Sequence, residues 1–215
     1  MNTLHQRTTQ MIWNRLGNTR GGTAINTAAL GGPGTVVLRR NQDATPEAPF
    51  AAPVDVINYA LTLEHIEATF YRDAVAMFKA ADYEAAGLQA GVADRIAAIS
   101  DHESAHVDAL IAVVKQLMGT PVEEAKYDFG YTDLASFLSL AAVIEGVGVA
   151  AYGGAAQYLQ GENDLLTAAL TIHGVEARHA AYLNVLTGTS PFPDAFNAPM
   201  TPADVVDTVT PFLVM

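Results

Sequence analysis

The amino-acid sequence predicts an all-α protein built around a bundle of four long helices. Between residues 53 and 187, four segments of roughly 25 to 28 residues each place apolar side chains at helical spacing. At 1.5 Å of rise per residue, each helix would be about 40 Å long. Helices of matched length can pack against one another along their whole length, which predicts a four-helix bundle.

The first two helices are expected at about residues 53–80 and 92–118. Pro53 suits the first turn of a helix, where a backbone N–H has no partner inside the helix. Gly119 and Pro121 follow the second segment, and both residue types commonly end helices. The connection between the two segments is short, which favours an antiparallel hairpin.

The third helix is expected to run to Gln160 from an N-cap at Thr132, and the fourth to Thr187 from an N-cap at Asn163. A glycine follows each of these helices and acts as a stop signal. About 13 residues separate the second helix from the third, so the pattern predicts two antiparallel hairpins joined by a crossover connection.

Three regions are expected along the chain, at residues 1–52, 53–188 and 189–215. The first region is rich in Gly, Thr and Asn, has no helical periodicity, and carries five Arg against two acids. Its charge is therefore +3, and since the whole chain carries −12, the remainder carries −15. We interpret the first region as an extended basic arm through which the protein forms a homo-oligomer or a larger assembly. The last region is expected to contain a short helix at about residues 202–209.

The composition excludes several classes of site. The chain contains no Cys, which excludes disulfides, thiolate metal sites and cysteine nucleophiles. A net charge of −12 argues against nucleic-acid binding, because affinity for nucleic acid comes mostly from Lys and Arg that neutralise phosphates. Any bound metal ion would therefore be held by carboxylate and imidazole groups.

The third helix raises the alternative of a membrane span. Residues 134–156 contain one charged side chain, Glu145, and are long enough to cross a bilayer. Their apolarity comes largely from Ala and Gly, however, and the other three helices carry charges along their length. We therefore expect a helix that is buried on several sides within the bundle, and no membrane span.

The expected location is the cytoplasm, with export as the alternative. Residues 1–20 contain no apolar run of signal-peptide length, and polar residues follow the pair Arg39 and Arg40. A chain without cysteine suits either redox compartment, so the composition does not decide between the two.

Six polar residues lie near the middle of the four apolar helices. Each helix contributes one Glu, and the second and fourth helices add a His three residues later. A Glu and a His at this spacing lie on one face of a helix, and all four Glu lie about 11 to 13 residues from the start of their helix. The side chains that can meet at one level of the bundle are Glu64, Glu103, His106, Glu145, Glu176 and His179.

This set of side chains fits a pair of divalent metal ions. Four carboxylates balance the charge of two divalent ions, and two neutral imidazoles complete a donor set suited to iron or manganese. Without metal, four buried carboxylates would repel one another, and some of them would take up protons. One Glu-x-x-His pair is common by chance, but two such pairs with two further mid-helix Glu predict a di-metal site.

An internal repeat supports this interpretation. Aligning Glu64 with Glu145 also aligns Tyr71 with Tyr152, each seven residues further on and on the same helix face. The two tyrosines are candidate catalytic residues, which could donate hydrogen bonds to the carboxylates or take part in electron or proton transfer. The alternative is that both are core aromatics with a satisfied hydroxyl group.

Four further residues lie close to the candidate ligands in sequence. Glu67 and His173 are each three residues from a candidate ligand and on its face, so they could be additional ligands or hydrogen-bond partners of the ligands. His65 and His102 directly adjoin candidate ligands, so we expect them to project to other helix faces.

The order Glu, Glu-x-x-His, Glu, Glu-x-x-His on four helices resembles the ferritin-like superfamily of di-iron and di-manganese carboxylate proteins. Three segments are similar to a ferritin-like group that includes plant desiccation-related proteins. These are NYALTLEHIEATFYRDA at residues 58–74, HESAH at 102–106 and VIEGVGVAAYGGAA at 143–156. The resemblance covers roughly residues 53–188 and implies a ferritin-like four-helix bundle.

The resemblance also implies that all six residues are metal ligands, with Glu103 and Glu176 bridging both ions. It fixes no single reaction, because the relatives include iron-storing ferroxidases, peroxide reductases, catalases and substrate oxygenases. We therefore expect a di-metal oxidoreductase that acts on dioxygen or peroxide or oxidises iron. The alternative is a structural or stress-protection protein that keeps the fold and uses residues 1–52 for self-assembly.

Overall fold

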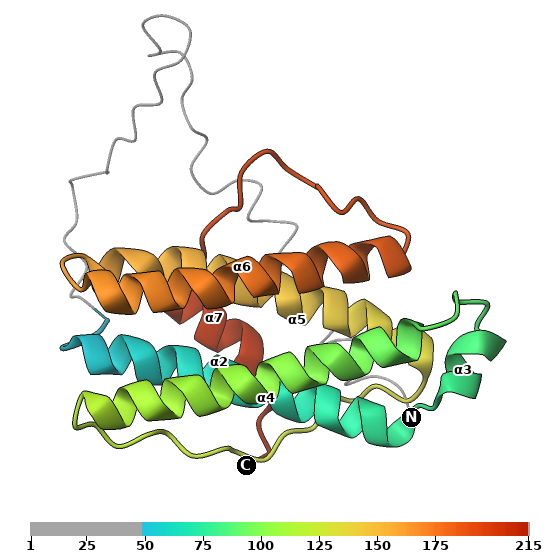
Figure 1. Ribbon diagram of the computed structural model, residues 1–215, viewed down its shortest axis with the longest axis horizontal. Coiled ribbons are helices and arrows are strands. Elements are labelled where there is room, and N and C mark those ends of the chain that lie inside the picture. The colour runs from blue at the N-terminus through green and yellow to red at the C-terminus, as the bar shows by residue number, and fades with distance from the viewer. Residues whose placement is uncertain (1–48, 215) are drawn as a thin grey trace, which may run out of the picture.

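The described part of the protein is an all-α bundle of four long helices, as predicted (Figure 1). The computed structural model describes residues 49–214, so nearly all of the expected arm at residues 1–52 lies outside the described residues. Within that range the only β-structure is one isolated bridge, between Tyr127 and Leu213. The long helices are α2 (Pro53–Met77), α4 (Val92–Gln116), α5 (Leu134–Ala155) and α6 (Asn163–Leu186).

The four helices form two antiparallel hairpins. Helix α2 packs mainly against α4, and α5 packs mainly against α6 (Figure 1). The chain between α4 and α5 crosses from one hairpin to the other along the lower side of the view in Figure 1. The predicted crossover connection is therefore confirmed.

The first helix ends earlier than the expected residue 80, because tertiary packing competes with helix continuation. Phe78 has extended backbone angles, and its ring lies 5.7 Å from that of Phe137 and 6.1 Å from that of Tyr131. The chain then forms a separate short helix, α3 (Ala80–Ala85). Aromatic contacts of this kind come from distant parts of the chain, so local periodicity cannot place the helix end.

Both predicted N-caps are off by one residue. The N-cap of α5 is Asp133 rather than Thr132, since the Asp133 carboxylate accepts a hydrogen bond of 2.7 Å from the backbone N–H of Ser136. The N-cap of α6 is Glu162, and Asn163 is the first helical residue. Helix α5 also passes into a short 3₁₀ helix, η3 (Ala156–Leu159), before the expected stop at Gly161.

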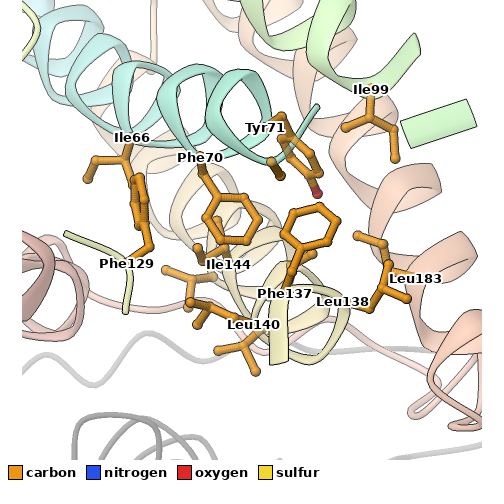
Figure 2. Packing of buried hydrophobic residues seen from close by; sticks show 14 of the residues in the cluster. Ile66, Phe70, Tyr71, Ile99, Phe129, Phe137, Leu138, Leu140, Ile144 and Leu183 are labelled. Carbon is orange, nitrogen blue, oxygen red and sulfur yellow. The ribbon is translucent and has the colours of Figure 1, made fainter. Parts of the chain in front are cut away.

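An aromatic cluster closes the bundle between α2, α5 and the crossover connection (Figure 2). Phe70 is fully buried, and its ring centroid lies 5.1 Å from those of Phe129 and Phe137 and 5.2 Å from that of Tyr71. Edge-to-face and offset contacts at these distances add to the stability that comes from burial. The cluster keeps water away from the middle of the bundle on this side.

Helix α5 is the most deeply buried helix. Within the described residues, Leu134–Leu159 is the one stretch that is long and apolar enough to cross a membrane, and 72% of its most apolar window is buried inside the protein. Such burial is expected for a central helix of a bundle, where small residues allow neighbours to approach closely.

A segment after α6 returns to cover the bundle with α7 (Pro202–Val209) and the 3₁₀ helix η4 (Thr210–Phe212). The short helix expected at residues 202–209 is confirmed. The backbone N–H of Met200 donates a hydrogen bond of 3.0 Å to the carbonyl of Ala150 on α5. This approach is so close that a Cβ atom at Gly154 would overlap the Met200 carbonyl oxygen.

We expect Gly154→Ala to lower the free energy of unfolding by about 1 to 3 kcal/mol, because the added methyl group forces the Met200 backbone away from α5. Urea denaturation of the metal-free protein measures the change. Gly146→Ala is the matched control on the same helix, since a Cβ there meets no atom within 4 Å. The control should be neutral or stabilise the protein by up to about 1 kcal/mol. Equal stability of the two variants would contradict the close approach.

Candidate metal centre

The structure brings all six sequence-predicted side chains together in the middle of the bundle. Each of the four long helices contributes one Glu, and each of these four carboxylates is 0% exposed. The two histidines, His106 on α4 and His179 on α6, are also buried. Charged groups are almost never fully buried in proteins unless they are paired or bind an ion, so this cluster requires a chemical explanation.

The six side chains form two groups of four, and each group could hold a metal ion. Within each group, one ligand atom per residue lies within 4.8 Å of every other. Two glutamates, Glu103 and Glu176, belong to both groups. The first group is Glu64, Glu103, His106 and Glu176, and the second is Glu103, Glu145, Glu176 and His179.

The two histidines face the shared carboxylates in related ways. His106 Nδ1 lies 3.0 Å from Glu103 Oε2 and 3.2 Å from Glu176 Oε1. His179 Nδ1 lies 2.9 Å from the other oxygen of Glu103, Oε1, and 3.4 Å from Glu145 Oε2. Each imidazole therefore lies next to a different carboxylate oxygen of Glu103, as expected for a site with approximate two-fold symmetry.

Two buried tyrosines donate hydrogen bonds to Glu64 and Glu145, the two carboxylates that each belong to one group only. Each tyrosine lies on the other hairpin from the Glu that it contacts. The hydroxyl of Tyr71 on α2 donates to Glu145 Oε1 on α5 at 2.6 Å. The hydroxyl of Tyr152 on α5 donates to Glu64 Oε1 on α2 at 2.5 Å. Burial and the nearby carboxylates raise the pKa of both phenols well above its usual value, so both stay protonated and act as donors.

Several ligand atoms have no hydrogen-bond partner within the described residues. Buried polar atoms are normally paired, and leaving one unpaired is costly. The atoms without a hydrogen bond are Glu103 Oε1, Glu145 Oε2, both carboxylate oxygens of Glu176, and His179 Nδ1. Four of these five lie within 3.4 Å of an imidazole nitrogen or a carboxylate oxygen of the cluster, but not in a hydrogen-bonding geometry. All of them belong to the two groups of four. Metal ions would satisfy these atoms, so the donor set fits a metal centre.

The electrostatics of the cluster favour a cation. Burial raises the pKa of Glu64 to about 8, and burial together with nearby carboxylates raises the pKa of Glu145 and Glu176 well above the usual range. Burial alone would lower the pKa of His106, but its carboxylate partners raise it to about 12. Without metal, these carboxyl groups bind protons in place of a cation.

Glu103 differs from the other three glutamates. Burial alone would raise its pKa, but the adjacent imidazoles of His106 and His179 outweigh this effect and lower it to about 2. Glu103 therefore stays ionised, and it is one of the two carboxylates that both groups share.

His65 and His102 adjoin candidate ligands in sequence, and both were expected to project to other helix faces. His65 does so, and its Nε2 lies 3.1 Å from the carbonyl of Val122 in the crossover. His102 is exposed and so also lies on a different face from the buried Glu103, but its Nδ1 lies 3.0 Å from Nε2 of His179, on the far side of that ring from the carboxylates. His102 precedes His106 by four residues, which places both on one side of α4, and this spacing is the signal that could have identified it.

Glu67 and His173 lie outside both groups of four, although both are near them in sequence. Glu67 is 3% exposed, and its Oε2 has no hydrogen-bond partner among residues 49–214. A Cβ atom at Gly148 on α5 would lie 2.8 Å from Glu67 Oε1 and 3.3 Å from Glu176 Oε2. The absence of a side chain at this position therefore leaves room for two carboxylates. His173 also has a buried, unpaired nitrogen, Nε2.

The sequence profile of the ferritin-like domain matches residues 52–189, which is more than half of the chain and includes α2, α4, α5 and α6. The chain belongs to the ferritin-like domain family. A comparison with curated proteins gave no match. Ferritin-like di-metal proteins carry a Glu on each of two helices and a Glu-x-x-His pair on each of the other two. The ferritin-like domain described here has that arrangement, and its buried Glu and His groups are suited to metal binding.

We expect the melting temperature of the metal-free protein to fall as the pH rises from about 5 to about 8. Glu64 has a pKa of about 8 in the folded state against 4.5 for an ordinary Glu, so the folded state binds the additional proton. The stabilisation that comes from this additional proton is complete below pH 4.5 and is lost as the pH rises through 8. The raised pKa of His106 acts in the same direction, whereas Glu103 does not titrate in this range.

Thermal unfolding followed by circular dichroism, with a chelator present, measures this effect. Glu64→Gln is the matched variant and should flatten the pH dependence, because it removes one of the groups that titrate. A melting temperature that rises with pH in the metal-free protein would contradict the protonated cluster.

Proposed function

We propose that this ferritin-like protein binds two divalent ions of iron or manganese and is an oxidoreductase that acts on dioxygen or peroxide. The observation that supports the proposal best is the pair of four-residue groups that share Glu103 and Glu176. Glu103 and Glu176 would contribute to the binding of both ions, and two ions held this close together would supply two electrons to one substrate molecule.

The donor types support the choice of metal. The chain has no cysteine, so the site offers carboxylate oxygens and imidazole nitrogens only. Mixed oxygen and imidazole donors suit iron and manganese, while soft thiolate donors would favour zinc or copper. Four carboxylates against two divalent ions give a neutral centre, which lowers the cost of burying the ions in the bundle.

Each protein group has a proposed role around the metals. When bound, iron or manganese would supply the one-electron redox steps that dioxygen or peroxide chemistry requires. Glu64 and Glu145 would each bind one ion, and the hydroxyl groups of Tyr152 and Tyr71 fix their orientation. The same hydroxyls are the nearest candidates for proton or electron transfer, because each contacts a ligand directly.

His102 adds a positioning role on the outside of the centre. His179 presents Nδ1 to the carboxylates, and its other nitrogen, Nε2, faces His102. A hydrogen bond on that nitrogen fixes the tautomer and the ring orientation of a histidine ligand.

Anaerobic loading with iron(II) followed by addition of dioxygen tests the proposal. We expect about two equivalents of iron(II) per chain and the oxidation of both ions by one dioxygen. That reaction takes up two protons and yields one hydrogen peroxide. Stopped-flow absorbance of iron(III) and a peroxide assay measure the two products. Binding of less than one equivalent of both iron(II) and manganese(II) would contradict the proposal, as would oxidation no faster than that of free iron.

Ligand variants test the shared geometry directly. We expect Glu176→Gln to weaken binding of both ions about 10- to 100-fold, and Glu145→Gln to weaken binding of one ion only. Equilibrium metal titration resolves the two binding events. Glu124→Gln is the control, because Glu124 is an exposed partner of Arg72 and belongs to neither group. Equal effects of the Glu176 and Glu145 substitutions would show that Glu176 is not shared.

A second candidate function is assembly or protection against stress such as desiccation. The charge distribution favours it, because residues 1–52 carry +3 and residues 53–215 carry −15, so one copy's basic segment can attract another copy's acidic body. Removal of residues 1–45 should then lower the oligomeric state measured by analytical ultracentrifugation. An unchanged oligomeric state would exclude a role of this segment in assembly.

A further inference from the structure

A small cavity lies beside the metal centre, between α2, α5 and the segment that covers them. Its volume is about 20 Å³. Helices α2 and α5 form its walls, and residues of α7 and η4 line its outer side. The residues that matter below are Leu63, Glu67, Val147, Gly148, Thr208 and Val209.

The walls of this cavity are almost entirely apolar. Only two lining residues carry a polar side chain, Glu67 and Thr208. The hydroxyl of Thr208 already donates to the carbonyl of Asp204 at 2.7 Å. A buried water needs two to four polar partners, and apolar cavities of this kind stay dry and bind nonpolar gases. The cavity therefore suits a small nonpolar molecule better than water or a charged solute.

The inner end of the cavity adjoins the metal centre. Gly148 lines the cavity, and the position its Cβ would occupy lies 3.3 Å from Glu176 Oε2. The same position lies 2.8 Å from Glu67 Oε1. Gly148 on α5 thus lies between the cavity and the shared carboxylate Glu176, and it has no side chain that would separate them. Any larger residue at 148 would push both carboxylates away.

We propose that this cavity is the binding and entry site through which dioxygen reaches the metal centre. The proposal rests on the proposed oxidoreductase function and narrows its substrate to dioxygen. A cavity of about 20 Å³ is large enough for one small molecule of this kind. Hydrogen peroxide is polar, and among the lining residues only Glu67 and Thr208 could hydrogen-bond to it, so the cavity suits it less well than dioxygen.

A second cavity of about 20 Å³ provides a matched control. It lies toward the other end of the bundle, and its lining includes Val113, Leu110 and Tyr152 but no candidate metal ligand. Val209 in the first cavity and Val113 in the second are both half-buried valines at the cavity wall. Substitution of either valine by phenylalanine fills its cavity from the rim without altering a residue of the metal centre.

The experiment uses the full chain with xenon as a probe of gas binding and dioxygen as the reactant. In the metal-free protein, xenon pressure should shift the methyl resonances of Leu63 and Val147, and Val209→Phe should abolish these shifts. In the iron(II)-loaded protein, Val209→Phe should raise the half-saturating dioxygen concentration about fivefold or more, with the maximal rate unchanged. Val113→Phe should alter neither measurement, and both variants should bind as much iron as the unchanged protein.

The outcomes separate this proposal from the proposed function. Absence of xenon shifts at Leu63 and Val147 overturns the cavity as a gas site, whatever the metals do. If xenon binds but Val209→Phe leaves the half-saturating dioxygen concentration unchanged, the entry route is overturned. The same holds if Val113→Phe raises that concentration as much as Val209→Phe does. In both cases the oxidoreductase function stands. If iron is bound but never reacts with dioxygen, both proposals fail, although xenon still binds.

Discussion

The burial of four carboxylates at one level of an apolar bundle is the constraint on which the rest of the structure depends. Each of these groups is 0% exposed, and each would be strongly destabilising if it were ionised and alone. The surrounding structure compensates by bringing two imidazoles and two phenol hydroxyls to the same place. The aromatic cluster around Phe70 and the covering helix α7 then limit the access of water, which strengthens these interactions.

Much of the fold and the candidate site could be predicted from the sequence, because both depend on helical periodicity. Apolar residues at helical spacing gave four helices, and the i, i+3 pairs Glu103–His106 and Glu176–His179 placed two ligands on one face. The equal distance of each Glu from its helix start then implied a common level. These inferences need only the geometry of single helices of similar length.

Features that depend on contacts between distant segments could not be predicted in this way. Helix α2 ends at Met77 because the ring of Phe78 packs against that of Phe137, and no local signal marks this contact. The role of Gly148 becomes visible only when Glu67 and Glu176 approach it from two other helices. The contact between His102 and His179 could not be predicted either, because it joins α4 to α6.

The sharing of Glu103 and Glu176 also has a mechanical consequence. Each group of four takes three ligands from one hairpin and one from the other, so an ion in either group would join the two hairpins as a cross-link. In a chain without cysteine, the metals would then stabilise the bundle much as a pair of disulfides would, but reversibly and to an extent that increases with the logarithm of the free metal concentration. Loss of metal would remove this cross-link and leave the two hairpins joined by their shared apolar core alone.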